Sequence, residues 1–215
     1  MLHSMRVVAG RHRGSILLAP PGNHTRPITD RVKESLFSIL GHRFGTLAEL
    51  PPFEVLDLFA GSGSLGIEAL SRGAGSCVFV EQDRRSSATL RKNLAKLRIG
   101  PAARIVNENA WYMRLPSSHT GGFGLIFVDP PYRESEDALR LLDFLSRIAP
   151  RLSRDGLLVL RVELDTHVPL AELRAVQCVD ERVYGRMRLL LLRRAPEVPG
   201  RITAPPVAPA PPTPE

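Results

Sequence analysis

Hydrophobic and polar positions between residues 54 and 164 form two kinds of segment that follow each other along the chain. Short apolar runs, typical of buried strands, alternate with longer segments whose apolar residues recur every three or four positions, as in amphipathic helices. The expected strands are residues 54–60, 77–83, 104–110, 125–128 and 156–164, and the expected helices are residues 64–74, 84–100 and 135–151. This alternation predicts an α/β fold with a doubly wound, mostly parallel sheet and right-handed crossovers.

The N-terminal part of the chain has a different pattern. Residues 5–18 contain two short β-like runs around a turn rich in Gly and Arg, which predicts a small basic hairpin. The next segment predicts a helix that Thr29 or Asp30 caps, that continues to about Leu40, and that Gly41 stops. We therefore expect a hairpin and a helix ahead of the main sheet.

The C-terminal part predicts an antiparallel end to the sheet. The runs 174–185 and 186–194 face each other across a Tyr-Gly turn, as the two strands of a hairpin do. Beyond them the chain is rich in Pro and Ala and poor in large apolar residues, so we expect it to be disordered. The expected organisation is an N-terminal extension (1–50), a catalytic domain (51–194) and a tail (195–215).

Composition narrows the possible partners. The 215 residues suffice for one domain, and 29 Lys and Arg against 22 Asp and Glu give a net charge of +7. This charge favours a nucleic-acid partner over a membrane, although a basic surface without any partner fits it equally well. Cys77 and Cys178 lie in apolar segments without the spacing of a metal site, and no apolar run is long enough to span a membrane. We therefore expect a cytoplasmic protein with reduced thiols and no metal.

A glycine-rich loop predicts an adenosine-containing ligand. The segment Gly61-Ser62-Gly63-Ser64-Leu65-Gly66 has the GxGxxG spacing and lies between an expected strand and an expected helix. Glu81 ends the next strand about 20 residues later, where an acid typically binds the hydroxyl groups of a ribose. The pattern indicates a nucleoside ligand without deciding which one.

Asp57 distinguishes between the candidate ligands. It lies a few residues before the first glycine, where its carboxylate would repel the pyrophosphate of NAD. The same charge suits S-adenosylmethionine, whose methionyl part carries an ammonium group and no phosphate. Glu81 would then accept from both ribose hydroxyls, and Asn109 with Ala110 lies where the adenine edge is expected. The alternative is that Asp57 only caps the turn and that the glycines only allow tight packing.

The expected strand 125–128 ends in Asp129-Pro130-Pro131-Tyr132, a pattern suited to an NH2 group on a planar base. The Asp129 carboxylate and the Pro130 carbonyl can accept the two N–H bonds, which frees the nitrogen lone pair for attack on a methyl group. Tyr132 can stack on the base, and no strong general base is needed because the sulfonium charge is neutralised by the transfer. The alternative is a turn that is merely rich in proline.

Four segments together carry a family resemblance. They are RPITDRVKESLFSIL, DLFAGSGSLGIEALSRGA, VEQD and FVDPPY, which begin at residues 26, 57, 80 and 127. The chain closely resembles the bacterial 16S ribosomal RNA guanine-N2 methyltransferases of the RsmD type over about residues 5–194. Tyr132 stands where some relatives have Phe, and the tail is additional. DPPY alone is shared by many amino-methyltransferases, whereas its combination with the upstream RPITDR segment is much more specific.

The resemblance implies a class I S-adenosylmethionine-dependent methyltransferase (Rossmann-like) fold and methylation of N2 of guanine 966 in 16S rRNA. Carried over to this chain, the catalytic residues would be Asp129, Pro130, Pro131 and Tyr132. The cofactor would be held by Asp57, Phe59, Ala60, Gly61, Ser62, Gly63, Glu81, Gln82, Asn109, Ala110 and Thr29. The substrate RNA would be bound by Arg6, Arg11, Arg13, Arg26 and Arg31.

Other acceptors of the methyl group remain open at this stage. The same four residues would serve adenine N6 or cytosine N4 in DNA, and a protein glutamine presents a similar amide. DNA enzymes usually carry a separate recognition domain, for which the short linkers leave no room, and glutamine enzymes typically have Asn in place of Asp129. The basic hairpin suits folded RNA. We therefore expect a monomer that acts on 16S rRNA within a small-subunit particle or assembly intermediate.

Overall fold

A computed structural model describes residues 5–19, 28–47 and 49–196 of the chain. Arg26 and nearly all of the expected disordered tail lie outside these residues, so neither expectation about them is addressed. Of the tail, only Ala195 and Pro196 are described, and the Ala195 N–H donates to the Ala175 carbonyl at 3.0 Å.

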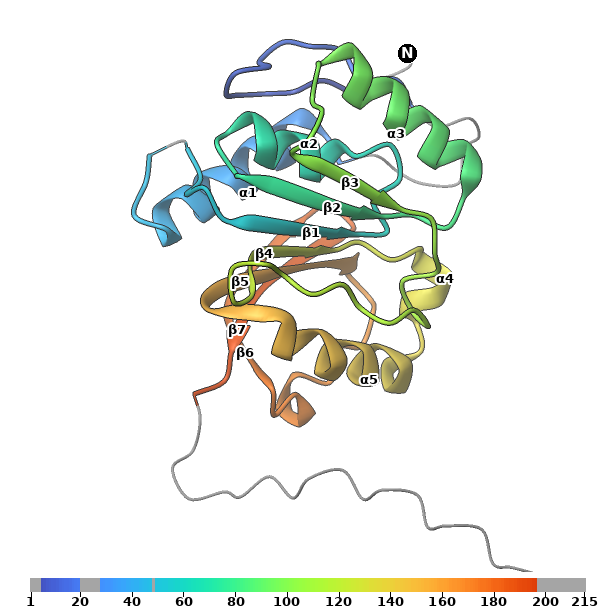
Figure 1. Cartoon of the computed structure of the whole chain (residues 1–215). Coiled ribbons are helices and arrows are strands. Elements are labelled where there is room, and N and C mark those ends of the chain that lie inside the picture. Colours follow the sequence, from blue (N-terminus) through green and yellow to red (C-terminus); the bar gives the residue numbers. More distant parts are fainter. Residues whose placement is uncertain (1–4, 20–27, 48, 197–215) are drawn as a thin grey trace, which may run out of the picture.

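A seven-stranded sheet with the order β3-β2-β1-β4-β5-β7-β6 forms the centre of the molecule (Figure 1). The strands are β1 (Glu54–Leu58), β2 (Ser76–Val80), β3 (Ala103–Val106), β4 (Phe123–Val128), β5 (Leu152–Glu163), β6 (Val176–Tyr184) and β7 (Met187–Arg194). Strands β1 to β5 pair in parallel, and β7 is antiparallel to both of its neighbours, β5 and β6. The predicted parallel sheet with an antiparallel C-terminal hairpin is therefore confirmed.

Helices cover both faces of the sheet, so that two apolar layers are buried. They are α1 (Asp30–Arg43), α2 (Ser64–Ser71), α3 (Arg84–Lys96), α4 (Tyr132–Ser135) and α5 (Ala138–Ile148), with the 3-10 turns η1 (Ala149–Arg151) and η2 (Leu170–Glu172). Helices α1, α2 and α3 share one apolar core with the sheet, and α5 forms the other (Figure 1). None of the helices within the described ranges is both long and apolar enough to cross a membrane.

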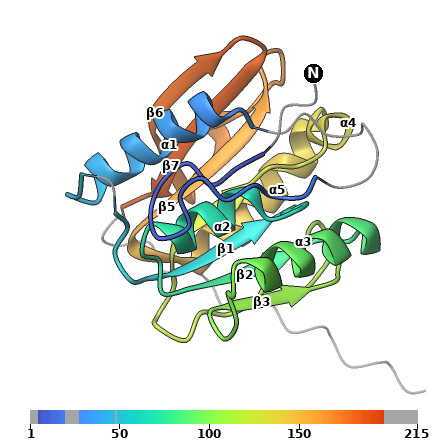
Figure 2. The same cartoon turned by 90° about the horizontal axis from the view of Figure 1, so that it is seen from above.

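The N-terminal segment forms the expected hairpin, reduced to a single bridge between Arg6 and Ile16. Backbone bonds from Val7 to Ser15 and from Leu17 to Met5 continue the antiparallel pairing, and the segment passes over α2 (Figure 2). Its apolar side chains join the core shared by α1 and the sheet. The hairpin is therefore an outer layer on the main domain and shares its core.

A buried carboxylate attaches this hairpin to α2. Glu68, which has no exposed surface, accepts from the Val8 N–H at 2.8 Å and from the Ala9 N–H at 3.0 Å. It also pairs with Arg72 at 2.8 Å and with the fully buried Lys33 of α1 at 3.8 Å. Burial lowers the pKa of Lys33, and the Glu68 charge opposes that shift. Because buried charges require partners, Glu68 links the hairpin, α1 and α2 in one network.

Two details of the sequence prediction are wrong. Gly41 does not stop α1, which continues to Arg43, because Gly41 is buried and a Cβ there would lie 3.2 Å from the Thr46 carbonyl. The helix expected at residues 135–151 is divided into α4, α5 and η1. Within it Leu139 is 75% exposed, and the buried residues of α5 are Leu141, Phe144, Leu145 and Ile148.

Replacing Glu68 by Gln tests the buried network. The amide keeps the shape of the side chain but removes the charge from Lys33 and Arg72, and its NH2 group cannot accept a backbone N–H. We expect the free energy of unfolding, measured with urea, to fall by roughly 3–5 kcal/mol. The same change at exposed Glu108 should cost less than about 0.5 kcal/mol. A similar small loss in both variants would contradict the proposed role of Glu68.

Candidate functional site

The carboxyl ends of the parallel strands gather the predicted chemistry at one edge of the sheet. The chain leaves β1 toward β2 and β3 on one side and later returns to β4 on the other, so the order reverses between β1 and β4. Ligands of open α/β sheets bind at such a reversal point. Asp57 lies in β1, Glu81 follows β2 and Asp129 follows β4, and the structure therefore brings these three acids to the same edge.

The glycine loop is held by bonds to the end of β2. The Ala60 N–H donates to the Val80 carbonyl at 2.9 Å, and the Gly61 N–H donates to Glu81 Oε2 at 2.7 Å. The second oxygen of Glu81 accepts from the Asp83 N–H at 2.7 Å. Burial raises the pKa of Glu81, while these backbone bonds oppose that shift. Glu81 thus fixes the loop with the same carboxylate that was predicted to bind a ribose.

The three glycines of the loop have different surroundings. A Cβ on Gly61 would meet nothing within 4 Å, whereas one on Gly63 would lie 2.3 Å from a Leu90 methyl. A Cβ on Gly66 would lie 2.3 Å from the Phe79 ring. Gly63 therefore allows close packing against α3, and Gly66 allows α2 to pack closely on the sheet, as the packing alternative proposed. Gly61 alone leaves room for a ligand to approach the backbone.

Asp57 is buried beneath this loop, with 2% of its surface exposed. Its Oδ2 accepts from the Gly66 N–H at 2.9 Å, which is the capping contact of the alternative interpretation. Burial raises the pKa of Asp57 to about 8, the Gly66 bond opposes this shift, and the charges of Asp129 and Glu81 add to it. The carboxylates therefore interact unfavourably, so this end of the sheet favours a positively charged ligand.

The segment after β4 leaves the sheet as the prolines predict. Pro130 is buried, Pro131 precedes the first residue of α4, and Tyr132 begins that helix with its side chain half-buried. Asp129 lies 2.8 Å from Arg161 of β5, measured from Oδ1 to Nε. Burial raises the pKa of Asp129, and the Arg161 guanidinium opposes that shift. The structure thus adds a cation to the predicted acceptor.

Sequence reasoning did not identify Arg161, although a signal was present. Arg161 interrupts an otherwise apolar run, and the structure leaves only 7% of it exposed. A charge within a buried strand needs a partner, so its position predicts an acid nearby without saying which one. Asn107 was also missed: its side-chain amide donates to the Glu81 carbonyl at 3.1 Å and links the ends of β2 and β3.

Residues expected near an adenine form a turn after β3. Asn109 Oδ1 accepts from the Trp111 N–H at 2.9 Å, and Ala110 is buried. The Trp111 ring packs on Phe59 with centroids 5.1 Å apart, which places the Phe59 side chain in the core on the α5 side. Ser62 is also buried, and its carbonyl accepts from Asn93 at 3.0 Å. Gln82 is exposed.

The described residues that were expected to bind RNA form two groups, one beside the start of α1 and one at the turn of the hairpin. Arg6 pairs with Asp30 at 2.6 Å, next to Thr29, whose hydroxyl caps α1; Arg31 is exposed. Arg11 and Arg13 belong to the turn of the hairpin, where the Arg11 N–H donates to Ser71 at the end of α2. Because α2 runs away from the glycine loop, this turn lies roughly 12 Å from it. The structure does not bring Arg11 and Arg13 to the carboxylates.

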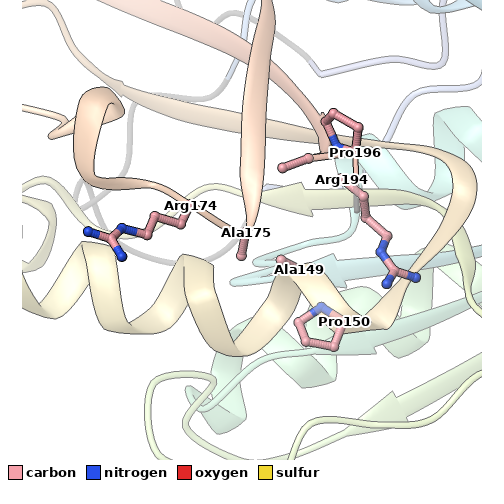
Figure 3. A pocket seen from close by; sticks show the side chains of 7 residues that line it. Ala149, Pro150, Arg174, Ala175, Arg194 and Pro196 are labelled. Atoms are coloured by element: carbon pink, nitrogen blue, oxygen red, sulfur yellow. The ribbon is translucent and has the colours of Figure 1, made fainter. Parts of the chain in front are cut away.

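A pocket of about 220 Å³ lies at the opposite edge of the sheet, where β5 begins and β7 ends. Figure 3 shows Arg174 and Arg194 on either side of Ala149 and Pro150. None of the predicted site residues lines this pocket. The candidate site is therefore defined by the arrangement of the acids, the glycine loop and the DPPY segment.

Comparisons with known proteins agree with the fold and identify the family of the chain. The family model described as conserved hypothetical protein 95 matches residues 5–193. The Bacillus subtilis protein YlbH, described as a candidate rRNA methyltransferase, is 39% identical over 166 residues, which are 77% of this chain and 86% of that protein. Ribosomal RNA small subunit methyltransferase D of Escherichia coli is 41% identical over 141 residues, 65% of this chain and 67% of that protein.

A solved structure shows the same architecture. The Escherichia coli protein yhhF, described as a candidate methyltransferase, has a TM-score of 0.71 and 34% identity, over 90% of this chain and 99% of that one. The fold is thus that of the class I methyltransferases, with the acids and the glycine loop at the expected edge. The chain belongs to the conserved hypothetical protein 95 family, and it is an rRNA methyltransferase of the RsmD type.

The raised pKa of Asp57 predicts a pH-dependent stability. Because its folded-state pKa lies above the unfolded value, the protonated group stabilises the fold below about pH 4, and this contribution is lost as the pH rises through about 8. Asp57→Asn keeps an acceptor for Gly66 and removes the charge. We expect the variant to lose less stability than the wild type between about pH 5 and about pH 9, by up to about 5 kcal/mol in urea unfolding.

The exposed Asp155 supplies the matched control for this measurement. Asp155→Asn removes the same charge from the surface and should keep the pH dependence of the wild type. An unchanged pH dependence in Asp57→Asn would show that Asp57 does not resist ionisation in the folded protein.

Proposed function

We propose that the protein transfers a methyl group from S-adenosylmethionine to the exocyclic N2 amino group of guanine 966 in 16S rRNA. The observation that carries the proposal is the position of Asp129 and Pro130 at the end of β4, beside the glycine loop and Asp57. The groups that would accept hydrogen bonds from an amino group therefore lie next to the site of an adenosine ligand. The named relatives support rRNA over the DNA adenine and protein glutamine alternatives.

The charges at the site support S-adenosylmethionine as the donor. After burial, the charges of Asp129 and Glu81 raise the pKa of Asp57 further, and a cation between the three acids would reduce the cost of ionising Asp57. A pyrophosphate would increase it. Gly61 leaves space for the ligand against the backbone, and Glu81 retains acceptor capacity for ribose hydroxyls. The residues present thus fit an adenosine attached to a positively charged group.

The same geometry assigns a role to each residue of the DPPY segment. The bound donor would supply a methyl carbon attached to a positively charged sulfur. Asp129 and the Pro130 carbonyl would accept the two N–H bonds of the amino group and localise the lone pair on its nitrogen. When the nitrogen gains the methyl group, the sulfur of the donor would keep the electron pair of the broken carbon–sulfur bond, and Asp129 or water would take one amino proton. Most of the rate enhancement would come from positioning and electrostatics.

The charge state of Asp129 favours guanine over adenine. Guanine carries N1–H next to its N2 amino group, so these two neighbouring positions both present donors, whereas adenine has an acceptor, N1, beside its N6 amino group. A carboxylate only accepts hydrogen bonds, and the Arg161 guanidinium favours that form of Asp129. A guanine N2 acceptor is therefore consistent with the pair.

Mapping the product tests this proposal. The wild-type protein is incubated with methyl-labelled S-adenosylmethionine and small subunits that lack the modification, and with the free 16S rRNA from them. We expect one label, on N2 of guanine 966, in the particle or in an assembly intermediate. Asp129→Ala should abolish transfer yet bind S-adenosylmethionine with an affinity within about threefold of the wild type by calorimetry, since it loses an acceptor needed only by the base. Label on another nucleotide or on protein would reject the proposal.

We further propose that residues 1–50 are an RNA-binding extension of a monomeric, cytoplasmic enzyme. Replacing Arg11 and Arg13 by Gln removes two charges from the hairpin turn. If both contact phosphates, the slope of log K against log salt for RNA binding should decrease by about 1.5. The double change Arg182→Gln and Arg186→Gln, in the β6–β7 hairpin, is the control and should leave the slope unchanged. Equal slopes in all three proteins would exclude the hairpin turn from the RNA contact.

A further inference from the structure

We propose that Arg161 is a positioning residue for the methyl transfer, which holds Asp129 as a carboxylate directed toward the amino group of the base. This inference rests on the proposed function, because Asp129 has this task only if an amino group is the acceptor. It assigns a role to a residue that lies outside the glycine loop and the DPPY segment.

The pairing of strands places Arg161 next to Asp129. Strands β4 and β5 run in parallel with Phe127 opposite Val159 and Val128 opposite Leu160. The next residue on each strand is Asp129 and Arg161, so the ion pair continues the register beyond the end of β4. The position of the Arg161 guanidinium is therefore set by the strand pairing and does not require a loop to move.

The two side chains lie on the same face of the sheet as Asp57. Phe127 and Val159 both belong to the apolar core under α1 and α2, and alternate residues along a strand point to the same face. Asp129 and Arg161 follow them by two positions. Asp57 is opposite Phe127 in the pairing of β1 with β4. Arg161 thus approaches Asp129 from one side of the site, and Asp57 lies on the other.

Packing alone gives no reason for an arginine here. The flanking residues Leu160 and Val162 are almost fully buried, and Arg161 itself is 7% exposed. Burying a charge costs several kcal/mol unless it is paired, and replacing a buried pair by apolar residues is often neutral or stabilising. A leucine would fill the strand without that cost. Among the described residues, Asp129 is the carboxylate that Arg161 faces, and this pairing offsets part of that cost.

The charges around Asp129 act in opposite directions. Burial disfavours its ionised form, whereas Arg161 of β5 favours it. Asp57 on β1 lies on the same face, and the charges of Asp129 and Glu81 add to the rise that burial causes in the pKa of Asp57. From α4, Glu134 bonds the Trp111 indole and pairs with Arg140, and from α1, Asp30 pairs with Arg6. Arg161 is thus the cation that the structure sets against these unfavourable effects.

The contact also selects one oxygen of the carboxylate. Arg161 Nε lies 2.8 Å from Oδ1, although its N–H is not aligned for a directed hydrogen bond, so the interaction is mainly electrostatic. Attraction of Oδ1 toward β5 leaves Oδ2 for the amino group. A protonated Asp129 could offer an O–H where an acceptor is needed, and the pair opposes that state.

Two substitutions separate charge from shape. Arg161→Met keeps the length of an apolar stem and removes the cation, whereas Arg161→Lys keeps a cation. Without a nearby opposite charge, the pKa of a carboxyl rises by about 1–3 units. In Arg161→Met, we expect the acid limb of the pH profile of kcat to move up by that amount, with the dissociation constant of S-adenosylmethionine within about threefold of the wild type. Arg161→Lys should restore most of kcat and the position of the limb.

A measurement without turnover gives a second reading of the same pair. The titration of Asp129 is followed by NMR of carboxyl carbons in protein labelled with ¹³C-aspartate, the signal being assigned by its loss in Asp129→Asn. We expect the midpoint to be higher in Arg161→Met and close to that of the wild type in Arg161→Lys. Arg193→Met, at an exposed position of β7, is the control for loss of an arginine from the sheet and should change neither reading.

The possible results are distinct. An unchanged Asp129 titration and pH profile in a folded Arg161→Met would overturn the inference while leaving the proposed function intact. Equal impairment of the Met and Lys variants, with an unmoved titration, would assign Arg161 to packing and would also overturn it. A wild-type protein that labels no guanine N2 would instead reject the proposed function, whatever the titration shows.

Discussion

The convergence of three acids at the end of a parallel sheet is the constraint on which the rest of the site depends. Parallel strands in register must end at one edge, and Asp57, Glu81 and Asp129 reach that edge from β1, β2 and β4. Burial raises the pKa of Asp57 to about 8, and the charges of Asp129 and Glu81 add to this rise. The folded protein is therefore less stable there than a neutral site would be, and a cationic ligand would recover part of that free energy.

Each of the three acids is controlled by a different partner. A backbone amide of α2 holds Asp57, the glycine loop and the start of α3 hold Glu81, and a side chain of β5 faces Asp129. Asp57 and Glu81 bind backbone N–H groups, so their positions are fixed together with the glycine loop. Only Asp129 relies on another charged side chain, which makes it the acid whose behaviour a single substitution elsewhere can change. This difference agrees with its assignment to the reacting group, while the others shape the ligand site.

Much of the site could be predicted because its signals are local. The glycine loop, Glu81 and the DPPY segment each depend on residues close together in sequence, and the alternation of strands and helices fixed the edge at which they meet. Arg161 and Glu68 could not be placed in this way, because they contact residues that are distant in the sequence. Asp129 is 32 residues from Arg161, and Val8 is 60 residues from Glu68. Gly41 was misjudged because close packing against Thr46, and not a helix end, explains why a residue without a side chain stands there.

The order of the last two strands has a consequence for how the chain is completed during synthesis. Strand β6 is made before β7 but pairs with no other strand in the described part of the chain, and β5 keeps an open edge until β7 fills it. Helix α1, made early, bonds β6 through Ser35 to Tyr184 and through Arg43 to the Val179 carbonyl. A nascent chain that stops before Met187 would thus expose strand edges that invite aggregation. The sixth strand can join the sheet only after the last eight residues of the sheet have left the ribosome.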